Sequence, residues 1–361
     1  MKKIFMTIVA VAAIAACSKT EVQYENSAEI GFAPAVKNVT KGAMTGVLAT
    51  VNPDQKLGIW AYWNYKNGNV TDSYDELYLN NATFKNKTVT YNDGSNDVTT
   101  SAFWAGENYA YPWPLNGKLR FAGYTIPTGQ NNDFEVSYSG VADDIVTFAN
   151  YTQQDGFDLC WFGATEATNK KNEADPAVSV TLSHALSWLS FYVKGDGTEG
   201  WKINSMVIND IASVGTGHCT GSGAGAAAWS FASNAYTTKM PLALVADLKL
   251  TNTLQNVEGE NVNNILVLPQ TINAGGQAEN ARTQHTLTIN YSFPVGNPDV
   301  ATNWKSESKT VNLDLTGTDI DNKWKSGFKY TYNLTFKSNE ILVSPTYGGW
   351  DTTISQGVTI E

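Results

Sequence analysis

Short apolar segments with alternating inward and outward positions recur along this 361-residue chain, separated by turn clusters rich in Gly, Asn and Asp. Residues 328–336 (FKYTYNLTF) show the pattern best, because every second residue is Phe, Tyr or Leu. Further candidate strands are 57–65, 118–126, 143–149, 157–163, 178–182, 184–194, 203–208, 263–269, 286–293 and 309–315. Convincing amphipathic helices are hard to find. The pattern predicts an all-β protein made of β-sandwiches.

A charged segment divides this pattern near its middle. Residues 166–176 (EATNKKNEADP) contain no large apolar side chain, which is typical of an interdomain linker. A long surface loop within one domain is the alternative. We predict an N-terminal domain at 17–175 and a C-terminal domain at 176–361. The small residues 215–228 (GTGHCTGSGAGAAA) predict a flexible loop.

The first seventeen residues have the features of a bacterial export signal. Two lysines precede an apolar run at residues 4–13, and Ile-Ala-Ala-Cys at 14–17 matches a lipobox. The apolar run is too short to span a bilayer. We expect a signal peptide at 1–16, lipidation of Cys17 and anchoring in the outer membrane by acyl chains. A plain signal peptide with a coincidental cysteine is the alternative.

Charge and motifs argue against several functional classes. The net charge is −10, and Arg120 and Arg282 are the only arginines, which argues against a nucleic acid partner. No Cys or His spacing resembles a zinc site, and the glycine-rich segment lacks a phosphate-binding pattern. We therefore predict no enzymatic activity, no catalytic residues, no cofactor and no metal.

The histidines and cysteines are expected to be structural. His184 lies in an apolar run and is expected to be buried and hydrogen-bonded. His218 and Cys219 are sequence neighbours, and neighbours seldom face each other as a nucleophile and its base do. Cys160 and Cys219 could form one disulfide in an oxidising compartment, but two separate buried thiols are favoured.

Several short motifs follow one another in an order that is more informative than any one of them. They are the lipobox at Cys17, then 30–32 (IGF), 58–63 (GIWAYW), 111–113 (YPW), 119–124 (LRFAGY), 183–187 (SHALS), 265–270 (ILVLPQ), 324–327 (WKSG), 330–332 (YTY) and Trp350. In this order the chain resembles the fimbrillins, lipoprotein pilus subunits of Bacteroides-type bacteria that build type V pili.

The resemblance implies two transthyretin-like β-sandwich domains and a structural function. In that family a protease removes the first strand, and the C-terminal strand of another subunit fills the opened groove. The partners implied are other pilus subunits, a lipid anchor in the outer membrane and an adhesion ligand on a host or bacterial surface. The implied location is the cell surface, in a fimbria.

The resemblance also suggests which residues take part in processing. The removable strand is expected at residues 29–33, with Ile30 and Phe32 pointing inward. Lys41, in Thr-Lys-Gly-Ala, stands where arginine is usual at the cleavage site, and Lys37 is a second candidate. The change from arginine to lysine leaves an uncut anchor subunit as an open alternative.

The C-terminal tail is the candidate donor strand. In residues 351–361 one face carries Ile354, Val358 and Ile360 together with Thr352 and Gln356, a period of two with a largely apolar face. The sequence leaves open whether this strand completes its own domain or that of a neighbour.

A surface glycan-binding lipoprotein is the alternative function. The chain has eleven tryptophans, and aromatic faces stack on sugars. Trp60 and Trp188 lie in apolar runs and are expected in the core. The tryptophans near turns are the better platform candidates: Trp104, Trp113, Trp229 and Trp350.

Overall fold

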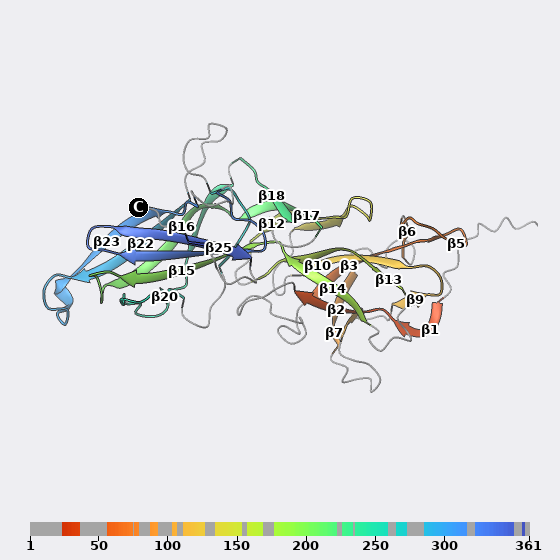
Figure 1. Cartoon of the computed structure of the whole chain (residues 1–361), viewed down its shortest axis with the longest axis horizontal. Helices are drawn as coiled ribbons and strands as arrows, with labels where there is room; N and C mark the ends of the chain where they lie inside the picture. Colours follow the sequence, from red (N-terminus) through yellow and green to blue (C-terminus); the bar gives the residue numbers. More distant parts are fainter. Residues whose placement is uncertain are drawn as a thin grey trace, which may run out of the picture.

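The computed structural model confirms an all-β chain. It describes residues 24–36, 56–74, 76–78, 87–92, 103–106, 111–126, 134–153, 157–168, 177–221, 226–233, 235–258, 265–272, 285–315, 322–349 and 356–357. Its one helical element there is a single 3₁₀ turn, η1 (Ala301–Asn303). Among these residues we find no helix with the length and apolar character that crossing a membrane requires. The strands form two groups along an elongated molecule (Figure 1).

Seven strands of the first group pair in a closed ring. Their order is β10 (Leu119–Ile126), β13 (Cys160–Ala167), β14 (Ala177–His184), β2 (Gly31–Val36), β8 (Phe103–Gly106), β7 (Lys87–Asn92) and β3 (Lys56–Trp63). The ring closes because β3 also pairs with β10 over eight register positions. Inside it lies a core that includes Leu57, Ile59, Leu119 and Phe121, all fully buried. Closure removes the free sheet edges that invite association.

Short strand pairs flank this ring. Strand β1 (Tyr24–Glu29) pairs with β9 (Pro112–Pro114), and β4 (Tyr65–Lys66) forms a hairpin with β5 (Asn69–Val70). Strand β6 (Glu76–Leu77) pairs with the end of β3.

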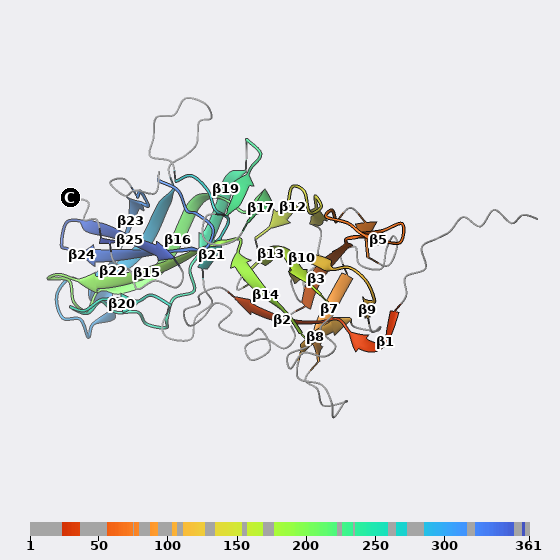
Figure 2. The same ribbon diagram turned by 45° about the vertical axis from the view of Figure 1, so that its right-hand side comes forward.

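A four-stranded sheet joins the two halves of the sequence. Its order is β11 (Glu135–Tyr138), β12 (Ile145–Thr152), β17 (Val214–Thr220) and β18 (Ala227–Ser230), and Figure 2 shows β12 and β17 between the two groups. One buried cluster contains Trp60, Tyr124 and Phe148 from the first half with Leu186 and Trp188 from the second. The two halves therefore share apolar packing.

Strands on both sides of the boundary predicted at residues 175/176 are hydrogen-bonded together. Strand β14 follows that boundary, yet it pairs with β13 and β2. Glu166 and Ala167, at the start of the predicted linker, lie in β13, and residues 169–176 lie outside the described residues. The division into two domains stays a prediction.

The prediction of a flexible loop at residues 215–228 is wrong, because β17 and β18 occupy most of this segment. Two glycines of β17, Gly215 and Gly217, are needed there for close packing rather than for flexibility. A Cβ atom at Gly217 would lie 2.9 Å from the ring of Trp229, and one at Gly215 would lie 2.7 Å from the ring of Phe231. Glycine in a strand often marks such a close approach.

The second group consists of two sheets packed face to face. One has the order β20 (Gln255–Asn256), β15 (Ser187–Gly195), β24 (Phe328–Phe336), β25 (Ile341–Gly349) and β26 (Gln356–Gly357), with β21 (Ile265–Val267) also beside β15. The other has the order β19 (Tyr236–Pro241), β16 (Lys202–Ala212), β22 (Thr286–Pro294) and β23 (Trp304–Asn312). Their facing side chains form one core, as in a sandwich.

Strand β24 confirms the alternation seen in the sequence. Tyr330, Tyr332, Leu334 and Phe336 are fully buried, whereas Phe328 at the strand's start is half-buried. The ring of Tyr332 stacks on that of Phe191 at 5.2 Å, and its hydroxyl accepts a 2.9 Å hydrogen bond from the indole of Trp324. These contacts place β24 at the centre of the second core.

Candidate strand-exchange site

Strand β2 is held along its length mainly by one neighbour. It runs parallel to β14, from the pair Gly31↔Ala177 to the pair Val36↔Leu182. On its other side, the described residues give a single register pair with β8, Phe32↔Trp104. A strand bound this way can separate with the loss of essentially one ladder.

The side chains of β2 and of the residue before it fill the core of the ring. Ile30 and Phe32 are fully buried, as the sequence predicts. The ring of Phe32 meets that of Phe121 edge to face at 5.0 Å, and the Ile30 N–H donates a 2.6 Å hydrogen bond to the carbonyl of Tyr111. Each large side chain buried this way contributes about 1.5–3 kcal/mol.

Removal of β2 would uncover a defined slot. Val178, Val180 and Leu182 of β14 belong to the same core cluster as Phe32 and are at most 2% exposed. Without β2 these side chains would face solvent, and the adjacent backbone groups of β14 would lack partners. Exposed strand edges beside apolar surface recruit other strands.

The described part of the tail lies on its own sheet. Strand β26 pairs with β25 through Tyr347↔Gln356 and Thr346↔Gly357. The remaining site residues predicted from the sequence lie outside the described residues: Cys17, Lys37, Lys41, Ile354, Val358 and Ile360. The structure therefore leaves the donor assignment as a prediction.

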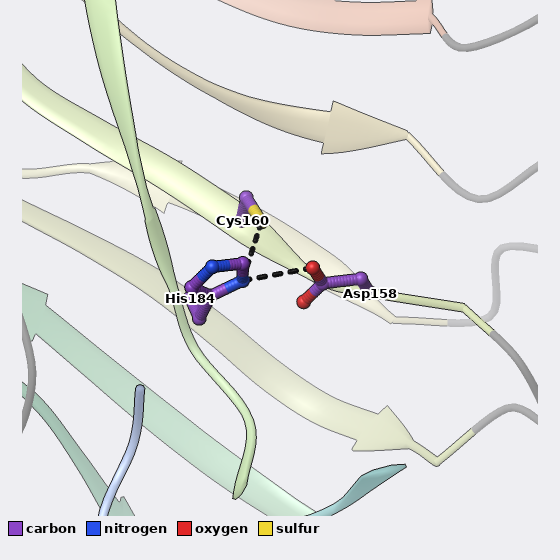
Figure 3. Close-up of side chains that lie close together, drawn as sticks. All are labelled: Asp158, Cys160 and His184. Atoms are coloured by element: carbon purple, nitrogen blue, oxygen red, sulfur yellow. Dashed lines mark hydrogen bonds and ion pairs between the residues drawn. The ribbon is translucent and has the colours of Figure 1, made fainter. Parts of the chain in front are cut away.

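A buried polar cluster lies on the opposite side of β14 from β2, where β14 meets β13. His184 is buried, and its Nδ1 lies 2.8 Å from Oδ2 of Asp158, which confirms the prediction of a buried, hydrogen-bonded histidine (Figure 3). The Sγ of Cys160 approaches the same Nδ1 at 3.6 Å. Burial and the charge of Asp158 raise the pKa of the Cys160 thiol well above its usual value.

This cluster lacks the arrangement of a cysteine nucleophile. In a nucleophile–base–acid triad the histidine contacts the thiol through one ring nitrogen and the carboxylate through the other. Here both partners approach Nδ1. Cys219, the other cysteine among the described residues, is also a buried free thiol. This confirms the prediction that Cys160 and Cys219 are two separate buried thiols. His218 is exposed and points away from buried Cys219.

The tryptophans divide between core and surface only in part as predicted. Trp60 and Trp188 are core residues, which confirms that prediction. The prediction that Trp113 is a sugar-stacking platform is wrong, because its side chain is 1% exposed and packs against Phe121. Trp229 is half-buried and borders a pocket of about 570 Å³. The side chains of Trp104 and Trp350 lie outside the described residues.

Comparison with known proteins identifies the family. The profile of the fimbrillin-like family matches residues 45–359. The chain belongs to the fimbrillin-like family. The match covers both halves of this fimbrillin-like protein, and it confirms the resemblance inferred from the ordered motifs and the prediction of a structural fimbrial subunit.

Individual relatives are similar to the chain over most of its length. The fimbrium subunit Fim1C of Phocaeicola vulgatus is 24% identical over 409 residues, covering 99% of each chain. Among solved structures, a Bacteroides uniformis protein assigned to cell adhesion has 16% identity and a TM-score of 0.47, covering 89% of this chain and 99% of its own. A fimbrial assembly protein from Parabacteroides distasonis has 9% identity and a TM-score of 0.36, covering 92% and 100%.

Proposed function

We propose that this fimbrillin-like protein is a non-enzymatic structural subunit of a cell-surface fimbria and that its subunits join by exchanging β2 for a strand of another subunit. The observation that supports strand exchange most directly is the position of β2. Phe32 of β2 and Ile30 just before it fill the core, yet among the described residues β2 is paired along its length with β14 and at one register position with β8.

The slot sets the requirements for an incoming strand. Ile30 and Phe32 are two positions apart on one face, so a replacement strand must offer apolar side chains with the same period. The tail carries this pattern at Ile354, Val358 and Ile360. Backbone hydrogen bonds to β14 would then join one subunit to the next, whatever other side chains the strand carries.

Proteolysis would open the slot. A cut after Lys37 or Lys41 separates β1 and β2 from the rest of the chain, together with the proposed lipid attachment at Cys17. In the described residues β1 contributes two register pairs with β9, Tyr24↔Pro114 and Glu29↔Pro112. One cleavage would thus release the subunit from its outer-membrane anchor and make it able to polymerise.

Digestion of the purified mature protein with a lysine-specific protease should produce fibres. We expect N-terminal sequencing to give Asn38 or Gly42 and electron microscopy to show fibres after gentle warming, which helps the cut strand to leave. The variant Lys37→Ala/Lys41→Ala should stay uncut at these positions and monomeric.

A second variant tests the C-terminal donor strand separately from the slot that accepts it. Protein truncated after Gly349 should be cut normally yet remain monomeric, and it should cap fibres of the intact chain when mixed with it. Fully cut, intact-tail protein that stays monomeric after the N-terminal fragment has been removed would contradict strand exchange while leaving family membership untouched.

Glycan binding is a second candidate function, supported by a pocket that β18 lines along its length. Trp229, Phe231 and Tyr236 line it together with Lys323 and Lys325, a combination of aromatic faces and cations that suits an acidic sugar. We expect a glycan array to report acidic glycans bound by the uncut monomer and the signal to fall in Lys323→Ala. An array with no acidic glycan above background would remove this candidate.

A further inference from the structure

The ladder between β13 and β14 brings three metal-ligating side chains together in the interior. Cys160 and His184 are directly opposite each other in the register, and Asp158 is two residues before Cys160. One ligand atom from each residue lies within 4.8 Å of the others, and all three residues are buried (Figure 3). The backbone ladder therefore fixes Cys160 and His184 opposite each other, and Asp158 precedes β13 by two residues.

Two buried oxygens near this cluster have no hydrogen-bond partner in the part of the chain that the structure describes. They are Oδ1 of Asp158 and the hydroxyl of Tyr151. Burial raises the pKa of the Tyr151 hydroxyl, and the charges of nearby Asp158 and Cys160 raise it further. Buried polar atoms without partners are rare, and a bound ion or water is a common explanation.

We propose that Asp158, Cys160 and His184 bind a zinc ion. A thiolate, an imidazole and a carboxylate are the ligand types that zinc takes in proteins. With bonds of about 2.3 Å to sulfur and about 2.0 Å to nitrogen, a tetrahedral angle separates the two atoms by about 3.5 Å. The observed separation of Sγ and Nδ1 is 3.6 Å.

Binding requires only a small rearrangement of the third ligand. Oδ2 of Asp158 and Nδ1 of His184 are 2.8 Å apart, so they must separate by about 0.5 Å to reach tetrahedral spacing. The thiol gives up its proton when the metal binds, so affinity should fall as the pH is lowered.

The ion would strengthen a short ladder. Strands β13 and β14 share only two register pairs, Cys160↔His184 and Trp161↔Ser183. A metal bridging the strands at the first pair would fix β14 against β13, on the side of β14 that faces away from β2. This role does not depend on strand exchange.

Metal analysis of the full mature protein tests the site. After treatment with a chelator and dialysis against buffered zinc, we expect about one zinc ion per chain. Cobalt in place of zinc should give a thiolate-to-cobalt charge-transfer absorption in the near ultraviolet, since Cys160 is a ligand. Cys160→Ser should lose this band and bind zinc at least about 100-fold more weakly, whereas Cys219→Ser, which alters a buried thiol elsewhere, should keep both.

The spectrum of the unaltered protein decides the matter even if a variant fails to fold. Absence of stoichiometric zinc, or cobalt bound without a thiolate band, would show a metal-free hydrogen-bonded cluster and overturn the proposal. So would a band that disappears in Cys219→Ser and persists in Cys160→Ser.

Discussion

Replacing Phe32 with alanine is expected to lower the free energy of unfolding of the uncut protein by about 3–5 kcal/mol. The phenyl ring is fully buried and meets Phe121 edge to face at 5.0 Å, so its removal leaves a cavity among residues that the backbone ladders hold apart. Urea denaturation followed by tryptophan fluorescence measures the loss.

A phenylalanine at a less buried position provides the matched control. Phe328 at the start of β24 is half-buried, so Phe328→Ala should cost clearly less than Phe32→Ala. Because Phe32 belongs to the strand that is proposed to leave, Phe32→Ala should also speed release of the N-terminal fragment after cleavage at Lys41. A loss smaller than that of Phe328→Ala would mean that β2 contributes little to the core.

Local patterns in the sequence predict several of the strands, among them β3, β10 and β24, but not β17, β18 or β25. Alternation in 328–336 reflects burial on one face, and the structure buries Tyr330, Tyr332 and Leu334 as that pattern requires. The inward placement of Ile30 and Phe32 follows from the same period of two. These features depend on neighbouring residues only, so one sequence is enough to find them.

Strand pairing could not be predicted, because it depends on contacts far apart in the chain. Strand β2 pairs with β14, which lies about 145 residues later in the sequence. No local sequence pattern predicts a parallel partner at such a sequence separation. The segment 215–228 was misjudged for the same reason. Its glycines suggest flexibility until the rings of Trp229 and Phe231 are seen to cover Gly217 and Gly215.

The candidate metal cluster left a weak local signal. Asp158 and Cys160 are two residues apart, so an extended backbone turns both side chains to the same side. The usual zinc patterns require paired Cys or His at short spacing, and His184 lies 24 residues after Cys160. The register of β13 with β14 brings His184 opposite Cys160, and the side-chain geometry adds the carboxylate of Asp158.

Replacing Gly123 with alanine should destabilise the ring of strands by about 3 kcal/mol, because the space for a side chain does not exist. A Cβ atom there would lie 2.5 Å from the ring of Phe162, 2.6 Å from the carbonyl oxygen of Gly58 and 2.8 Å from Cδ1 of Ile59. The carbonyl belongs to the β3–β10 ladder and cannot move without breaking it, so the added carbon forces β10 away from its neighbours.

A glycine in a turn separates this packing effect from a backbone effect. Gly68, between β4 and β5, has a φ of +82° and nothing within 4 Å of an added Cβ, so Gly68→Ala should cost only about 1 kcal/mol through its left-handed backbone. Urea denaturation and near-ultraviolet circular dichroism of both variants test the difference. Equal losses would mean that β3, β10 and β13 are not packed closely enough to exclude a methyl group, and the closed ring that holds the slot for β2 would then be looser than its pairing implies.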